Sequence, residues 1–125
     1  MSKYNYIGSN VTIMVKSMAK SIKFYTETLG LPLRVRHSSH WAEIDAGGLI
    51  IGLHPFVKTK KIIRGDNMTI GLEVDDFETA IQKLEQKGIQ FDIQKYSVAL
   101  LAYFNDPDDN VLYLFQYKSK SQKKH

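Results

Sequence analysis

Twice along the chain, the spacing of apolar residues changes from every second position to every third or fourth position. Each such change marks a strand followed by a helix. In Asn10–Lys16 apolar residues occupy alternate positions, which is the period of a strand with one buried face. From Ser17 to Gly30 they recur every three or four positions, which predicts a helix that Ser17 caps and Gly30 ends. Alternation and turn residues predict three further strands, at Leu33–His37, Trp41–Asp45 and Leu49–His54.

The same order of elements is then repeated. A strand is predicted at Met68–Val74 and a helix at Phe77–Lys87, which Asp75 or Asp76 caps and Gly88 ends. The remaining strands are predicted at Gln90–Gln94, Val98–Phe104 and Asn110–Tyr117. We therefore predict an α+β fold of two βαβββ modules, each with a helix on one face of a four-stranded sheet. Pairing the modules would place the two uncovered sheet faces around a shared, cup-shaped cleft.

The predicted organisation is a single domain over residues 1–117. Module one covers about residues 9–56, a connector covers 57–67, and module two covers about 68–117. Residues 118–125 form a basic tail that we expect to be disordered, since runs of like charge at chain ends are usually solvated.

Composition narrows the function classes. The net charge is +4, but without the four lysines of the last eight residues the basic and acidic residues are equal in number. No folded basic surface is therefore predicted, and we expect no nucleic-acid partner. No apolar run approaches the roughly 20 residues that span a bilayer, and no signal peptide is visible, so we expect a cytoplasmic protein without a membrane partner. The absence of cysteine excludes disulfides and thiolate zinc sites.

Two stretches resemble the two ends of a known family. Val11–Leu31, with Lys20, Ser21, Phe24, Tyr25, Leu29 and Gly30, resembles the opening module of the vicinal oxygen chelate superfamily, which includes glyoxalase I, extradiol dioxygenases, fosfomycin-resistance enzymes and bleomycin-resistance proteins. Asp106–Phe115 resembles the closing signature of that superfamily, a DPDGN turn that leads into a strand. The resemblance covers nearly all of the chain outside the tail. It implies the paired βαβββ fold and a homodimer.

In metal-dependent members, the resemblance implies a divalent ion held by a histidine on the first strand, a histidine or similar ligand opening the fifth, and a glutamate on the last. By register these positions fall on Asn10, Thr69 and Tyr113. An amide, an alcohol and a phenol supply no formal charge to offset the desolvation of a divalent cation. Gly52 stands nearest to an additional glutamate of glyoxalase I members. We therefore predict no metal site and no cofactor.

Without a metal, the sheet faces that alternate away from the helices predict an aromatic cup for a small molecule. The predicted ligand-binding residues are Asn10, Thr12, Arg34, Trp41, His54, Thr69, Tyr103, Tyr113 and Phe115, and Met14 and Arg36 are expected on the same side. With two arginines in an otherwise neutral body, we expect a neutral or anionic aromatic ligand. The alternative for each aromatic is packing against the other module or another subunit.

Two enzymatic alternatives stay open. One is a metal-dependent lyase or dioxygenase of the glyoxalase or extradiol type with a displaced metal site, for example at His37, His40 and His54. The other is a metal-free lyase or isomerase with Glu43 or Glu73 as general base, because burial beside aromatic rings would raise the pKa of a carboxyl. A salt bridge to an arginine is the ordinary alternative for these glutamates. Thr12 and Tyr103 also match positions that some fosfomycin-type members use.

Overall fold

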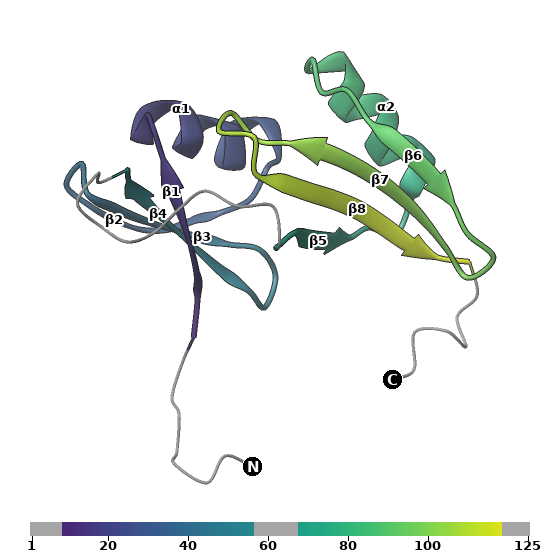
Figure 1. Ribbon diagram of the computed structural model, residues 1–125, viewed down its shortest axis with the longest axis horizontal. Helices are drawn as coiled ribbons and strands as arrows, with labels where there is room; N and C mark the ends of the chain where they lie inside the picture. The colour runs from purple at the N-terminus through teal and green to yellow at the C-terminus, as the bar shows by residue number, and fades with distance from the viewer. Residues whose placement is uncertain (1–8, 57–67, 119–125) are drawn as a thin grey trace, which may run out of the picture. The chain divides into compact units, whose positions relative to one another are not determined.

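The computed structural model describes residues 9–56 and 68–118, and the chain divides into two compact units, Met1–Arg64 and Gly65–His125. The predicted connector at 57–67 and residues 119–125 of the predicted tail lie outside the described residues. In each unit one helical segment covers one face of a four-stranded mixed sheet (Figure 1). This arrangement confirms the predicted α+β fold of two βαβββ modules.

The first unit contains strand β1 (Val11–Val15), the helical segments α1 (Met18–Lys23) and η1 (Phe24–Thr28), and strands β2 (Leu33–His37), β3 (Trp41–Asp45) and β4 (Ile50–Pro55). The strand order in the sheet is β1-β4-β3-β2. β1 lies parallel to β4, and the other pairs are antiparallel. Strands β2 and β3 have the bounds that the sequence predicts, and β4 begins and ends one residue later than predicted.

The first helix begins and ends as predicted but changes its hydrogen bonding midway. The Ser17 hydroxyl accepts from the backbone N–H of Lys20 at 3.2 Å, and Gly30 follows the helix with a φ of +76°. From Phe24 the segment is a π-helix, in which the N–H of Leu29 donates to the carbonyl of Phe24 at 2.9 Å. The predicted helix is therefore present, but the periodicity of its apolar residues did not indicate the change to π geometry in its second half. Within this segment Tyr25 is fully buried.

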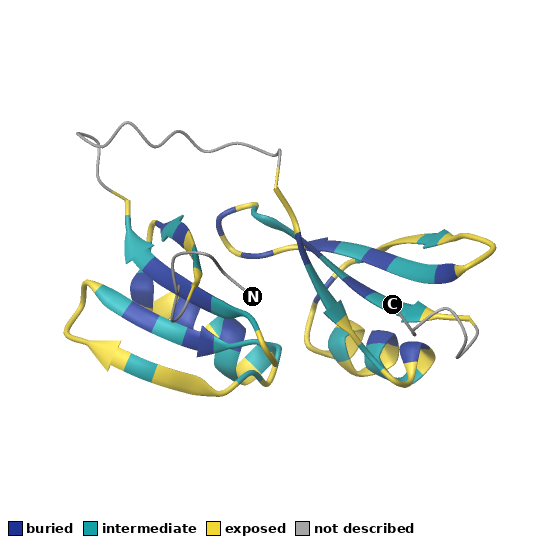
Figure 2. Cartoon of the chain, turned by 90° about the horizontal axis from the view of Figure 1, so that it is seen from below, coloured by how far each residue is buried: buried dark blue, intermediate teal, exposed yellow. Residues whose placement is uncertain are grey.

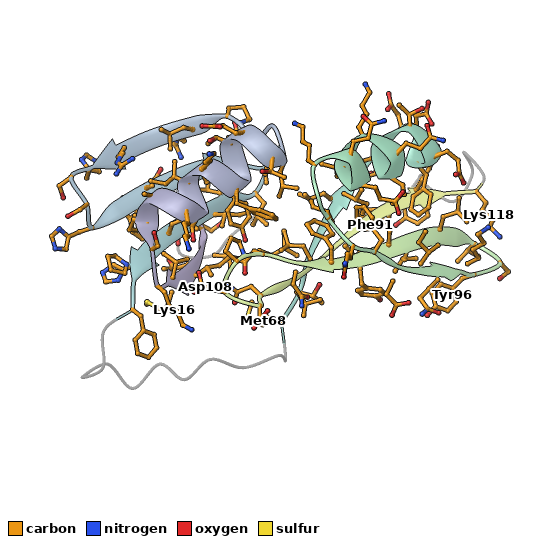
Figure 3. The ribbon with its side chains drawn as sticks, turned by 90° about the horizontal axis from the view of Figure 1, so that it is seen from above. Lys16, Met68, Phe91, Tyr96, Asp108 and Lys118 are labelled. Carbon is orange, nitrogen blue, oxygen red and sulfur yellow. The ribbon has the colours of Figure 1, made fainter. Side chains whose placement is uncertain are left out.

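The second unit repeats the arrangement with β5 (Ile70–Glu73), α2 (Phe77–Gln86), β6 (Asp92–Lys95), β7 (Ala99–Asn105) and β8 (Val111–Tyr117). The strand order is β5-β8-β7-β6, with β5 parallel to β8 and the other pairs antiparallel. Phe91 lies next to α2 (Figure 3). Its ring meets that of Phe104 edge to face, with centroids 5.4 Å apart.

Each core lies between the helix and the sheet of its own unit. The buried strand residues on the helix side are Ile13, Val15, Ala42, Ile44, Ile51 and Leu53 in the first unit, and Ile70, Ala102, Phe104, Leu112 and Leu114 in the second. Their alternation with half-buried and exposed residues is visible along the strands in Figure 2, where edge strand β2 is mostly exposed. Among the residues that the structure describes, no helix of the same unit lies against the opposite face of either sheet.

No helix within the described ranges is long and apolar enough to cross a bilayer.

Asp76 caps α2, as one of the two predicted alternatives. Its carboxylate accepts from the Thr79 hydroxyl at 2.8 Å and from the Thr79 backbone N–H at 3.2 Å. These two hydrogen bonds hold the pKa of Asp76 below its usual 3.8. A carboxyl whose pKa is lowered by folding stabilises the fold above its unfolded-state pKa, and the stabilisation is lost as the pH falls through the folded-state pKa.

We expect Asp76→Ala to lower the Tm at pH 7, because the cap is removed. The difference in Tm between the variant and the parent should shrink as the pH falls below about 3.8, because the Asp76 carboxylate of the parent becomes protonated. Thermal unfolding between pH 7 and pH 2.5 measures both effects. Asp75→Ala is the control. Asp75 accepts from the Gln116 side chain through its backbone carbonyl, which alanine keeps. A Tm difference that stays constant with pH would contradict the prediction.

Candidate functional site

The predicted site residues fall on the uncovered faces of the two sheets. The Trp41 face, on the first sheet, carries Thr12, Arg34, Trp41, Glu43 and His54, and Asn10 directly precedes β1. The Tyr113 face, on the second sheet, carries Glu73, Tyr103, Tyr113 and Phe115, and Thr69 directly precedes β5. The strand registers make these side chains neighbours on each sheet. Thr12 and Glu43 lie on either side of Gly52, and Tyr103 lies beside Tyr113. The structure thus groups the predicted residues into two sets. Their roles in binding or catalysis stay predictions.

Trp41 lies across Gly52 of the neighbouring strand. A Cβ atom on Gly52 would lie 2.8 Å from Cζ2 of the indole and closer still to Cη2, so only glycine leaves room for the ring. The indole Nε1–H donates to Oε2 of Glu43 at 2.9 Å. The ring is therefore held by a contact at its six-membered end and a hydrogen bond at its five-membered end. A half-buried tryptophan fixed in this way is a preorganised apolar surface.

Glu43 links Trp41 to Arg34. Its Oε1 lies 3.3 Å from Nη1 of Arg34, while Oε2 accepts from the indole. The side chains of Arg34 and Glu43 are 56% and 21% exposed, so the ion pair is worth little stability by itself, about 0–1 kcal/mol. The salt bridge that the sequence offered as the ordinary alternative to a general base is present. Glu43 orients the indole and offsets the charge of Arg34.

The prediction that Arg36 lines the same face is wrong. The pairing of β2 with β3 shifts between Leu33 and Val35, and after the shift Val35 stands opposite Glu43 while Arg36 stands opposite the buried Ala42. Such a bulge places one extra residue in β2, so strict alternation fails beyond it. The same shift brings His37 opposite Trp41, a neighbour that alternation did not identify.

His54 lies on β4 opposite Met14 of β1. Its Nδ1 is 2.7 Å from the carbonyl oxygen of Pro55, and the residue is half-buried. One step back along β4, Leu53 pairs with Ala42, so the same register continued by one residue places His54 beside Trp41. The predicted site residues of this sheet are therefore neighbours around the indole.

The Tyr113 face carries a row of four aromatic rings, Tyr103, Tyr113, Phe115 and Tyr117. Successive ring centroids lie 5.4, 5.7 and 5.6 Å apart, the spacing of favourable aromatic pairs. The Tyr113 ring lies across Gly71 on β5, where an added Cβ would be 2.5 Å from Cζ. Both sheets thus hold one aromatic ring over a glycine. Tyr117, and Leu101 opposite Phe115, belong to this face and were not among the predicted site residues, although both follow the alternation of their strands.

The three residues that the family resemblance places at metal-ligand positions do not fit a divalent ion. Asn10 Oδ1 already accepts a hydrogen bond from the Thr12 hydroxyl at 3.0 Å, and the ring of Tyr113 lies across Gly71. Asn10, Thr69 and Tyr113 offer no imidazole and no carboxylate. In residues 9–56 and 68–118 no three histidine, aspartate or glutamate side chains form a group that could hold a metal ion, and His37, His40 and His54 form none either. Stoichiometric nickel, zinc, iron or manganese in the purified protein would contradict this assignment.

The turn before β8 positions Tyr113. Asp106 is only 4% exposed, and its Oδ1 accepts from the backbone N–H groups of Asp108 and Asn110, each at 2.9 Å. Its Oδ2 accepts from the Asn110 side-chain amide, also at 2.9 Å. Asp109 stands where the DPDGN signature has glycine and adopts a φ of +64°, a conformation that aspartate tolerates better than most residues. The turn predicted from Pro, Asp and Asn is therefore held by one buried carboxylate.

Similarity to known proteins agrees with this architecture. The glutathione transferase FosA of Serratia marcescens is 31% identical over 111 residues, which are 85% of this chain and 77% of that one. A glyoxalase family protein from Bacillus anthracis superposes with a TM-score of 0.72 at 18% identity, over 91% of this chain and 98% of its own. TnmS3, an antibiotic binding protein from Streptomyces sp. CB03234, superposes with a TM-score of 0.70 at 23% identity, over 90% and 98% of the two chains.

Residues 7–114, which include the three helical segments and every strand except the end of β8, match the sequence profile of one superfamily. This match extends from the residues before β1 into β8 and agrees with the resemblance that the two ends of the chain predict. The chain therefore belongs to the Glyoxalase/Bleomycin resistance protein/Dioxygenase superfamily.

Proposed function

We propose that the chain binds a small, planar aromatic molecule against the indole of Trp41. The observation that carries the proposal is the fixed indole, held over Gly52 and hydrogen-bonded to Glu43. An aromatic ligand would stack on a surface that is already ordered, so little conformational entropy is lost on binding. We favour a neutral ligand, because Glu43 offsets the charge of Arg34 and Arg36 lies on the other side of the sheet.

The relatives support a small-molecule ligand. FosA is a glutathione transferase, and TnmS3 is an antibiotic binding protein, so both act on or bind small organic molecules. The low identity to TnmS3 limits that comparison to the fold, and function depends on the side chains of each site. In this chain the side chains around Trp41 combine one large apolar surface with a few polar groups, which is typical of small-molecule sites.

We expect Trp41→Ala to weaken the binding of 2-naphthol, a neutral planar probe, at least about tenfold, or about 1.4 kcal/mol, because the stacking surface is removed. Isothermal titration calorimetry measures the affinity. Trp41 is the single tryptophan of the chain, so one indole N–H signal in the NMR spectrum should shift as the parent protein is titrated.

Tyr96→Ala is the matched control, because Tyr96 is 50% exposed at the turn between β6 and β7, outside both aromatic faces (Figure 3). It should bind 2-naphthol as the parent does. Equal affinity of the Trp41→Ala variant and the parent would refute the proposal. The anionic 2-naphthoate is the charge comparison, and tighter binding of it than of 2-naphthol would overturn the preference for a neutral ligand.

A further inference from the structure

The hydrogen bond of His54 determines which of its ring nitrogens carries the proton. Nδ1 lies 2.7 Å from the carbonyl oxygen of Pro55, and a carbonyl oxygen can only accept. Nδ1 is therefore the donor. In the neutral imidazole Nε2 is then left with a lone pair, and it is an acceptor. Within residues 9–56 and 68–118, Nε2 of His54 has no hydrogen-bond partner.

The position of His54 makes this acceptor relevant to the Trp41 face. The register of β3 with β4, continued by one residue, places His54 beside Trp41. The polar atoms nearest in sequence and register are already engaged, since the indole N–H donates to Glu43 and Glu43 also contacts Arg34. His54 is half-buried and Met14, an apolar neighbour, stands on its other side. A ligand stacked on Trp41 would leave Nε2 without water unless the ligand itself supplied a donor.

We propose that Nε2 of His54 accepts a hydrogen bond from the ligand, which makes the ligand a planar aromatic molecule with an O–H or N–H donor on its ring edge, such as a phenol or an N–H heterocycle. This inference rests on the proposed function. A site built to accept a hydrogen bond discriminates against an analogue that lacks the donor, because a desolvated acceptor is left unpaired. His54 would thus determine specificity, while Trp41 supplies most of the contact area.

The pH dependence should follow from the same hydrogen bond. When the imidazole is protonated, both ring nitrogens donate, and His54 can no longer accept from a phenol. Among the described residues, the other charged or titratable groups on this sheet face are Arg34 and His37 on β2, Glu43 and Asp45 on β3, and Lys16 directly after β1. His37→Gln is the control for the pH effect, because it removes the other histidine of this sheet face.

The test compares 2-naphthol with 2-methoxynaphthalene, which has the same rings but no donor, by calorimetry at pH 7.5. The parent should prefer 2-naphthol by about tenfold, the effect of one hydrogen bond to an acceptor that the bound ligand removes from water. His54→Ala should bind the two probes alike, whereas His54→Gln, which keeps an acceptor oxygen, should retain part of the preference. Acidification that protonates His54 should lower the preference equally in the parent and in His37→Gln.

The outcomes separate this inference from the proposed function. If the parent binds both probes equally and Trp41→Ala weakens both, the stacking site stands and the role of His54 is refuted. If the preference for 2-naphthol persists in His54→Ala, another acceptor makes the hydrogen bond, and the inference is again refuted. If the parent binds neither probe at any pH tested, the proposed function itself fails.

Discussion

Gly52→Ala is expected to destabilise the protein by about 2 kcal/mol and to release the indole of Trp41. The new methyl group would overlap the six-membered ring, and rotating the ring away breaks its hydrogen bond to Glu43. Loss of a hydrogen bond to a charged acceptor costs about 1.5–3 kcal/mol. Alanine in a strand recovers only about 0.5–1 kcal/mol relative to glycine. Urea unfolding measures the stability, and the emission maximum of the single tryptophan should shift to longer wavelength.

Gly71→Ala is the matched control for this variant. It places a methyl group against the Tyr113 ring in the other unit, so it should lower stability without changing the emission of Trp41. Gly52→Ala should weaken 2-naphthol binding as Trp41→Ala does, whereas Gly71→Ala should leave that affinity unchanged. In the double variant Trp41→Ala, Gly52→Ala, the cost of the added methyl group should disappear, because nothing remains for it to displace. A Gly52→Ala variant with parental emission and affinity would contradict the assigned contact.

Asp106→Ala is expected to cost about 3 kcal/mol of the free energy of unfolding. The substitution removes a buried carboxylate that accepts three hydrogen bonds, two from backbone N–H groups and one from the Asn110 amide. The cost arises less from the bonds themselves than from the backbone donors of Asp108 and Asn110, which are left without an acceptor in the turn. The turn also determines where β8 begins. We therefore expect the lower stability in urea unfolding to be accompanied by weaker packing of the aromatic rings on the Tyr113 face.

Exchanging the side chains of Asp106 and Asn110 tests this interpretation. In Asp106→Asn the charged acceptor is lost and the new amide NH2 can only donate, so the Asn110 amide must turn to present its Oδ1, and part of the stability should be lost. Adding Asn110→Asp restores an acceptor opposite the new donor, and the double variant should recover much of that loss. A loss below about 1 kcal/mol in Asp106→Ala would show that solvent or neighbouring groups replace the carboxylate.

Much of the fold was predictable because local signals agree along the chain. The caps at Ser17 and Asp76 and the glycines after each helix mark the helix ends. The alternation of apolar residues predicts all eight strands, with their ends within two residues, because each sheet buries one face against a helix. Local patterns do not specify the hydrogen-bond register between strands, and they do not specify the change from α to π geometry at Phe24.

The residues of the candidate site were predictable to the same extent. Their prediction also failed where it depended on the register between strands. Parity along each strand correctly assigned Trp41, Glu43 and His54 to one face and Tyr103, Tyr113 and Phe115 to another. It misplaced Arg36, because a bulge adds one residue to β2 and reverses every side chain after it. The shared cleft, the homodimer and the cytoplasmic location stay predictions.

The turn and strand at Asp106–Phe115 and the repeated βαβββ pattern determine, from sequence alone, that this chain has the superfamily fold. This inference needs only residue identity and local periodicity. The correspondence of Asn10, Thr69 and Tyr113 to the metal-ligand positions of other members stays a prediction from the resemblance. The tertiary structure decided that Gly52 lies under the Trp41 ring, that Glu43 joins Trp41 to Arg34, and that His54 presents Nε2 as an acceptor. Each of these contacts depends on atoms from different strands or on a specific rotamer, which only the packed chain specifies.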